Sequence, residues 1–476
     1  MKLHLKQNKK LKNHLKIKYM KTNMLNVLKT TFIISVSATV PFMAQNNQEE
    51  KFKHEFIPQI MTRGEYRHGY QALADTNQRP ATFVGQRTRL TYKMISEKFD
   101  IVITAQDIRV WGSNANLPVD TSGKLSLAEG YGVIKLDKIN KLKVGRQIIS
   151  YDEDRILGSL DWAFQSRRHD LVVFEHKNDT MLTFHVGAAW NQNKDYLNTT
   201  VYSVPGNYKT MQYLWLFRQM KKWNISVLIL NNGTQLTKTD PNTGQKKYYD
   251  CYSQTMGFNT QIKPIEKLTI KSFAYYQMGF DATATNASGN AKAINAYDAS
   301  LEANYKIIGW LNATIGGEIL SGTSQDPNKQ SQLLSFNPYY GTNHRFNGYM
   351  DYFYVGNHLK SVGLIDAYLK LNFGKGKWNA FVNVHNFQAA ADIKDVKKST
   401  PTQFVAMDRQ LGQEVDITFL YKISDGVSVQ AGYSQMFGTE SLRALKGGNT
   451  SATSNWAYLM FHFRPGVLFP RTGLKQ

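Results

Sequence analysis

Alternation of apolar and polar side chains with a period of two constrains this chain more than any other feature of its sequence. The alternation recurs in segments of about ten residues, the length of a β-strand that crosses a membrane. Leu182, Val186 and Trp190 share one face of such a segment, while Thr183 and His185 share the other. Side chains of successive strand residues point to opposite faces, so these segments predict strands with one apolar and one polar face.

Tight turns and long polar links join these segments alternately. Turn formers or charged residues lie between two alternating runs at 177–180, 264–267, 374–377 and 423–426, which is the signature of a hairpin. The long links are expected at 191–209, 231–253, 281–293, 322–358 and 435–455. Tight turns on one rim and long loops on the other are the plan of an outer-membrane barrel.

The fold class predicted from these segments is all-β, a transmembrane antiparallel β-barrel of the outer-membrane type with about 18 strands. The strands are expected to begin near residues 56, 82, 99, 128, 141, 170, 181, 210, 223, 254, 267, 295, 311, 360, 377, 412, 427 and 455. Many aromatic residues lie at strand ends, as they do in the girdles at a membrane interface. A large soluble β-sandwich or β-helix is the alternative architecture.

The amino-terminal segment, 1–44, is predicted to be a secretory signal peptide. It carries nine Lys and no acidic residue, and an apolar run over 31–43 ends in a small residue, Ala44. A positive region, a short apolar region and a small residue before the cut are the parts of such a signal. Cleavage after Ala44 leaves 45–476 as the barrel. A basic amphipathic helix or a membrane anchor is the alternative, although the apolar run is short for a bilayer.

Net charge and cysteine content limit the partners. The chain has 58 Lys and Arg against 36 Asp and Glu, a formal charge of +22, and nine of these charges belong to 1–44. The remaining excess is interleaved with strands instead of forming a patch, which argues against nucleic acid as a partner. The one cysteine, Cys251, excludes an internal disulfide, and the scattered histidines show no metal spacing. Neither a metal nor a cofactor is predicted.

Arginine is concentrated in the first part of the barrel. Ten of the 16 Arg lie between Arg63 and Arg168. Alternation places Arg87 and Arg89 on the face opposite Leu90. Because an Arg on the lipid face costs roughly 2–4 kcal/mol near the midplane, Arg87 and Arg89 are expected to face the lumen.

Two later arginines are assigned by the same rule. Arg109 alternates with apolar neighbours and is therefore expected in the lumen. Arg146 shares the face of Val144 and reaches the lumen only if the strand bulges at Gly145. A lumen lined by guanidinium groups would be an anion path. In the alternative, the arginines only neutralise inward acids. The candidate partners are Asp107, Asp152, Glu153, Asp154 and Asp161.

Three motifs carry a resemblance to a known family. They are GRQIISYDEDRILGSLDW (145–162), QRTRLTYK (86–93) with QDIRVWG (106–112), and FNPYYGTNHRFNGYMDYF (336–353). Over 56–463 the chain resembles the alginate-export family of outer-membrane barrels. The resemblance implies an 18-stranded monomeric barrel with an electropositive constriction, through which an anionic polysaccharide leaves the cell.

The resemblance also implies roles for individual residues of this sequence. A pore-lining role is implied for Arg87, Arg89, Arg109, Arg146 and Arg155. A role as gate or salt-bridge partner is implied for Asp152, Asp161, His344, Arg345 and Asp351.

The leading functional prediction is an outer-membrane channel that exports an alginate-like polysaccharide or oligosaccharide and has no enzymatic activity. Its expected partners are the anionic polysaccharide, outer-membrane lipid and periplasmic export components. The first alternative is a general or uptake anion-selective porin. The second is a hydrolase embedded in the barrel, although the sequence has no Gly-x-Ser-x-Gly motif.

Overall fold

The computed structural model describes residues 52–114, 125–178 and 182–466. The predicted signal peptide lies outside these residues and stays a prediction. Within the described ranges, no helix is long and apolar enough to cross a membrane.

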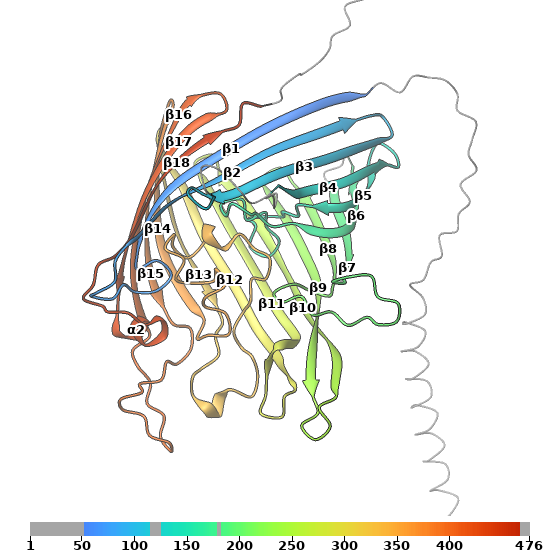
Figure 1. Cartoon of the computed structure of the whole chain (residues 1–476). Helices are drawn as coiled ribbons and strands as arrows, with labels where there is room; N and C mark the ends of the chain where they lie inside the picture. The colour runs from blue at the N-terminus through green and yellow to red at the C-terminus, as the bar shows by residue number, and fades with distance from the viewer. Residues whose placement is uncertain (1–51, 115–124, 179–181, 467–476) are drawn as a thin grey trace, which may run out of the picture. The chain divides into compact units, whose positions relative to one another are not determined.

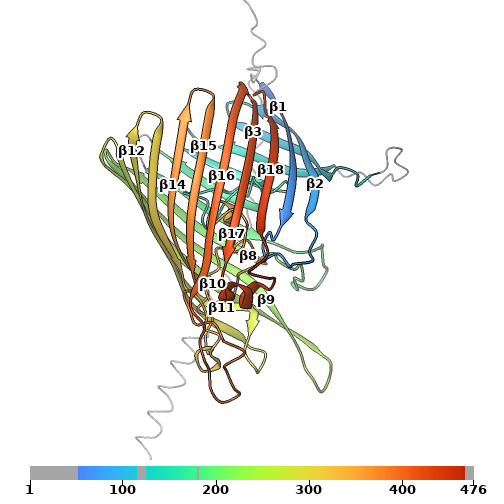
Figure 2. The same cartoon turned by 90° about the vertical axis from the view of Figure 1, so that its left-hand side faces the viewer.

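Antiparallel strands, 18 in the described residues, form one closed sheet (Figures 1 and 2). Each strand pairs with its neighbours in sequence, and β1 pairs with β18 to close the barrel. The strands are β1 (Lys53–His68), β2 (Ala81–Ile95), β3 (Phe99–Val110), β4 (Ser126–Lys135), β5 (Asn140–Gln147), β6 (His169–Lys177), β7 (Leu182–Trp190), β8 (Thr210–Gln219), β9 (Trp223–Thr239), β10 (Lys246–Ile265), β11 (Leu268–Thr285), β12 (Ala291–Ile308), β13 (Leu311–Leu320), β14 (Leu364–Lys375), β15 (Trp378–Gln388), β16 (Gln410–Ser424), β17 (Val427–Gly438) and β18 (Ser454–Phe463). The predicted fold class and strand count are confirmed.

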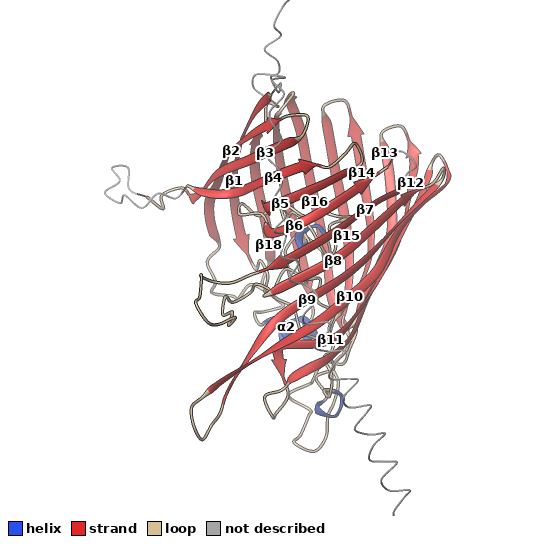
Figure 3. Ribbon diagram, turned by 90° about the vertical axis from the view of Figure 1, so that its right-hand side faces the viewer, coloured by secondary structure: helices blue, strands red, loops and turns tan. Residues whose placement is uncertain are grey.

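The main departure from the predicted strands is in two hairpins at the rim of long loops. The predicted link 231–253 is mostly strand, because β9 and β10 continue pairing up to Thr239 and Lys246. The predicted link 281–293 is shortened in the same way by β11 and β12. Polar residues occupy both faces of these extensions, so the apolar–polar alternation that reveals a strand is lost there. Figure 3 shows the β9–β10 hairpin reaching beyond the neighbouring strands.

The outer surface of the barrel is apolar and has aromatic residues at both rims. Trp223, Trp310 and Trp378 are exposed beside short turns, and Trp111 and Trp190 are exposed at the opposite ends of their strands. An apolar exterior with aromatic girdles is the surface of a strand barrel in a lipid bilayer.

Two long links fold into the barrel instead of away from it (Figure 1). We call 148–168, between β5 and β6, the strut loop, and 321–363, between β13 and β14, the plug loop. The plug loop contains two short 3-10 helices, η1 (Pro327–Lys329) and η2 (Asn343–Arg345). The loops meet where Leu157 forms a parallel bridge with Tyr340. A third long link, between β17 and β18, contains the helix α2 (Glu440–Lys446).

Backbone strain is concentrated in the strut and plug loops. Ten non-glycine residues of the described chain have positive φ, and nine of them lie in these two loops. Each such residue costs free energy and persists only where its surroundings hold it in place. The two loops are therefore fixed by contacts with the barrel wall.

Candidate channel constriction

One charged contact of the strut loop with the wall, at Asp161, is made by arginines of β2. The Arg89 guanidinium donates to the Asp161 carboxylate at 2.8 Å, and Arg87 lies 3.3 Å from the same group. The Ser166 hydroxyl donates to Asp161 at 2.6 Å. Burial raises the pKa of the Asp161 carboxyl, but Arg87, Ser166 and Arg89 outweigh burial and the pKa lies below its usual range. Asp161 is therefore an anion at neutral pH.

A second charged contact of the strut loop, at Arg155, carries the opposite arrangement of charges. The Arg155 guanidinium is fully buried, donates to Asp298 of β12 at 3.1 Å, and forms an ion pair with Glu318 of β13. It also lies over the Phe346 ring, 4.6 Å from the ring centroid. Because β2 lies on the other side of an 18-stranded ring from β12 and β13, the strut loop crosses the lumen.

The plug loop is anchored to inward carboxylates of the same wall. The Asn347 amide donates to Glu318 at 2.9 Å and to Asp366 of β14 at 3.3 Å. The Met350 backbone N–H donates to Glu414 of β16 at 2.8 Å. These bonds tie the plug loop to buried carboxylates of the wall, one of which, Glu318, is also the partner of Arg155.

Two predicted gate residues are brought together within the plug loop. His344 Nδ1 lies 2.6 Å from Asp351, which also accepts a hydrogen bond from the Tyr70 hydroxyl. The His344 ring stacks on Trp162 of the strut loop, with 4.5 Å between centroids and 11° between planes. This stack links the two loops beside β18, because both rings also pack against Trp456.

The space left around the strut loop forms three cavities, of about 380, 200 and 390 Å³. Arg345 lines both the first and the third, and Asp161 lines both the second and the third. The cavities are therefore neighbouring parts of one lumen that the two loops subdivide.

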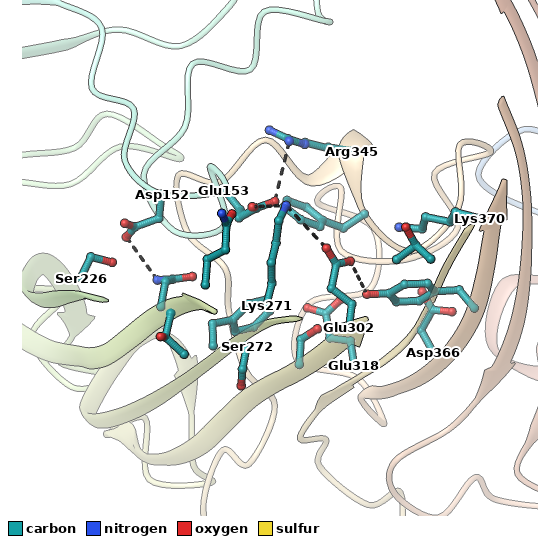
Figure 4. Close-up of a pocket in the computed structure, with 18 of the residues that line it drawn as sticks. Asp152, Glu153, Ser226, Lys271, Ser272, Glu302, Glu318, Arg345, Asp366 and Lys370 are labelled. Carbon is teal, nitrogen blue, oxygen red and sulfur yellow. Dashed lines mark hydrogen bonds and ion pairs between the residues drawn. The ribbon is translucent and has the colours of Figure 1, made fainter. Parts of the chain in front are cut away.

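Charged side chains from both loops and the wall meet in the first cavity (Figure 4). Lys271 of β11 lies 2.7 Å from Glu153 and 3.6 Å from Glu302 of β12. Arg345 approaches Glu153 at 3.7 Å, and the Tyr368 hydroxyl donates to Glu302 at 3.0 Å. These contacts leave the cavity without a surplus of positive charge.

Asp152, a further predicted gate residue, borders the same cavity. Its carboxylate accepts hydrogen bonds from Trp215 Nε1 at 3.1 Å and from the Asn259 amide at 3.2 Å. Burial raises the pKa of the Asp152 carboxyl. The residue thus ties the strut loop to the inner faces of β8 and β10.

The predicted lumen arginines divide into two groups. Arg87, Arg89 and Arg155 are buried inside the barrel, where they pair with carboxylates. Their part in transport stays a prediction. The expectation that Arg109 and Arg146 face the lumen is wrong, and each lies outside.

Arg109 and Arg146 form ion pairs on the outer surface. Arg109 lies 2.6 Å from Asp107, two residues earlier on β3. Arg146 pairs with Asp170 of β6 at 2.9 Å, and the β4–β5 register runs without a shift through Gly145. The bulge that would turn Arg146 inward is absent from this pairing.

Sequence reasoning did not select the cations that are left unpaired in the lumen. Within the described residues, Arg168, Arg464 and Lys370 have no carboxylate within the 4.0 Å limit of an ion pair. Arg168 and Arg464 line the second cavity, and Lys370 lines the first. Strand alternation could have assigned Lys370, whereas Arg168 precedes β6 and Arg464 follows β18, outside the strands, where alternation carries no information.

The hydrolase hypothesis requires a nucleophile beside a His–acid pair. Two such pairs lie inside the barrel, His344 with Asp351 and His385 with Asp366, the latter at 3.0 Å. In the described part of the chain, no serine hydroxyl is hydrogen-bonded to either imidazole. The first pair lies within the plug loop, and the second joins β15 to β14.

Comparison with solved structures places this architecture among outer-membrane channels. OccAB1 of Acinetobacter baumannii aligns with a TM-score of 0.58 and 12% identity over 87% of this chain and 97% of that chain. OccK9 (OpdG) of Pseudomonas aeruginosa aligns with a TM-score of 0.55 and 12% identity over 87% and 99%. OpdK of the same organism, solved with vanillate, aligns with a TM-score of 0.50 and 10% identity over 86% and 98%.

No model of a known protein family matches the sequence, and no curated protein matches it. The 18-stranded outer-membrane barrel implied by the resemblance is confirmed, whereas membership in the alginate-export family is not shown. The chain is a bacterial outer-membrane protein with the fold of the porins, a closed 18-stranded antiparallel β-barrel.

Proposed function

We propose that this protein is a passive outer-membrane channel for small hydrophilic solutes. The observation that carries the proposal is the lumen itself. Two strained loops are clamped across it, and cavities around them measure about 200–390 Å³. Spaces of this size suit a small molecule better than a polymer chain. A small solute, vanillate, is also what the structural neighbour OpdK was solved with.

This proposal favours the general or uptake porin over polysaccharide export. We propose a weak anion preference that arises from the second cavity, because its two cations without an ion pair, Arg168 and Arg464, outnumber its one such acid, Glu129, while Arg89 is neutralised by Asp161. Unpaired cations along a pore favour anions.

Export of an anionic polysaccharide is the second candidate. The inward row Tyr213, Trp215 and Phe217 on β8 favours it, since rings two residues apart form a track along the strand. A polymer could follow this track only if the strut and plug loops left the lumen. For this export function we also propose that the barrel is a monomer and acts with periplasmic export components.

Reconstitution of the full chain in a planar bilayer tests the proposed function. We expect stepwise conductance in KCl and a reversal potential in a KCl gradient that indicates a preference for Cl⁻. The variant Arg168→Gln should reduce the Cl⁻/K⁺ permeability ratio by about twofold, because it removes one unpaired lumen charge. The control Arg443→Gln changes a residue of α2 that is paired with Glu440 outside the cavities. Absence of conductance would refute the channel, and an equal change in both variants would refute the assigned anion path.

A further inference from the structure

The first cavity has a side of neutral hydrogen-bonding groups that the ion pairs do not use. The side chains of Asn224 and Gln261 line it, and neither makes a hydrogen bond to another described residue. The β9–β10 register places Asn224 directly opposite Gln261. Each amide offers both donors and an acceptor, so the pair can bind two adjacent hydroxyl groups of one ligand.

An aromatic ring lies beside these amides. Phe217 of β8 lines the cavity and is half-buried, and the β8–β9 register pairs it with Ser226, the next inward residue after Asn224. Its ring is nearly parallel to that of Trp215, at 10° and 5.7 Å, and Trp215 stacks on Tyr151 at 4.7 Å. The stack fixes the orientation of the platform before a ligand arrives.

The charges of the first cavity argue against an anionic ligand at this position. Lys271 lies between two carboxylates, and Arg345 faces Glu153. Lys370, the cation without a carboxylate partner among the described lining residues, lies over the Tyr368 ring at 4.0 Å from its centroid. Together with the acids that line the cavity, these contacts leave no excess positive charge to bind the carboxylate of an anionic ligand.

We propose that the first cavity is a binding subsite for one pyranose ring of a neutral sugar. The apolar C–H face of the sugar would lie on Phe217, and its hydroxyl groups would bind the amides of Asn224 and Gln261. A pyranose has one apolar face and an edge of hydroxyl groups, which match a ring platform bordered by amides. This inference rests on the proposed channel function and names a class of solute for it.

Current block in planar bilayers tests the subsite. Glucose added to the full-length channel in KCl is expected to block the current in a saturable manner. Phe217→Ala should raise the half-blocking concentration by about two- to tenfold, the worth of one aromatic stacking contact. The double variant Asn224→Ala and Gln261→Ala should raise it by a similar factor, because it removes two hydrogen-bonding groups.

Phe373→Ala is the matched control for the loss of a ring from the wall. Phe373 lies on β14 and packs against Trp310, away from the cavity lining. It should leave the half-blocking concentration unchanged. Normal KCl conductance without any block by glucose would overturn the sugar subsite while leaving the channel function intact. Stronger block by glucuronate than by glucose, or an equal effect of Phe373→Ala, would overturn it as well.

Discussion

The two charged contacts of the strut loop, which we call its ends, at Asp161 and at Arg155, use arginine and carboxylate in opposite directions. At β2 the wall supplies Arg87 and Arg89 and the loop supplies Asp161, whose side chain is 46% exposed. At β12 and β13 the loop supplies Arg155 and the wall supplies the carboxylates, with 0% exposure of both Arg155 and Asp298. The contact at Asp161 is open to water, and we call it the wet end. The contact at Arg155 is closed to water, and we call it the dry end.

This difference determines how strongly each end holds. A buried ion left without its partner is costly, whereas an ion pair in contact with water is weakened by screening and can exchange its partner for water. The dry end is therefore the fixed anchor of the strut loop, and the wet end is the adjustable one. The paired arginines inside this barrel hold the strut loop to the wall. Only the unpaired arginines have a guanidinium group that is not neutralised by a carboxylate.

Removing the ion pairs of the dry end should have the largest effect on the free energy of unfolding. In Arg155→Met, Asp298 and Glu318 lose their common cation inside the protein. We expect the free energy of unfolding to fall by about 3–5 kcal/mol, as for other buried pairs that lose one partner. Urea unfolding in detergent, followed by tryptophan fluorescence, measures the change. Arg443→Met on the exposed helix α2 is the control, and a loss below about 1 kcal/mol at Arg155 would contradict the comparison.

Removing the ion pairs of the wet end should have a smaller effect on the free energy of unfolding. Asp161→Asn removes the carboxylate, but Arg87 still donates to the backbone carbonyls of Asp161, Ala163 and Phe164. We expect a loss of about 1 kcal/mol in unfolding free energy and larger current fluctuations in the open channel, because the strut loop is held less firmly at that end. A loss as large as that of Arg155→Met would show that the two ends do not differ.

Acid should produce the smallest effect at the wet end. The pKa of Asp161 is lower in the folded protein than its ordinary value. Its contribution is therefore complete above about pH 3.9 and is lost as the pH falls through the lower folded value. Current fluctuations should be constant from neutral pH to about pH 3.9 and increase below it. Asp161→Asn should remove this acid response; a transition above pH 5 that the variant abolishes would contradict the assignment.

Much of the barrel could be predicted from the sequence, because the residues of each strand follow the environments on its two faces. Lipid on one side and a polar lumen on the other impose alternation on every crossing segment, so the observed strand count matches the predicted one. The rule that charged side chains face the lumen fails at strand ends, outside the hydrocarbon core of the membrane. Arg109 and Arg146 lie near strand ends on the outer face, where an ion pair removes the penalty that was expected to turn them inward.

The site was less predictable, because its residues are chosen by loops that return to the wall far along the chain. Alternation correctly placed Arg87 and Arg89 inside, and the motif around Arg155 indicated an important segment. It could not indicate that Arg155 meets Asp298, which is 143 residues away. Nor could it distinguish a paired arginine from the unpaired Arg168.

The sequence by itself determined the strand pattern, the closed barrel and its membrane-facing surface, since these depend on the periodicity of nearby residues. Only the tertiary structure decided which charges are neutralised and which remain open to a solute. The physical reason is that an ion pair depends on distance in space, and the folding of the strut and plug loops into the lumen sets those distances.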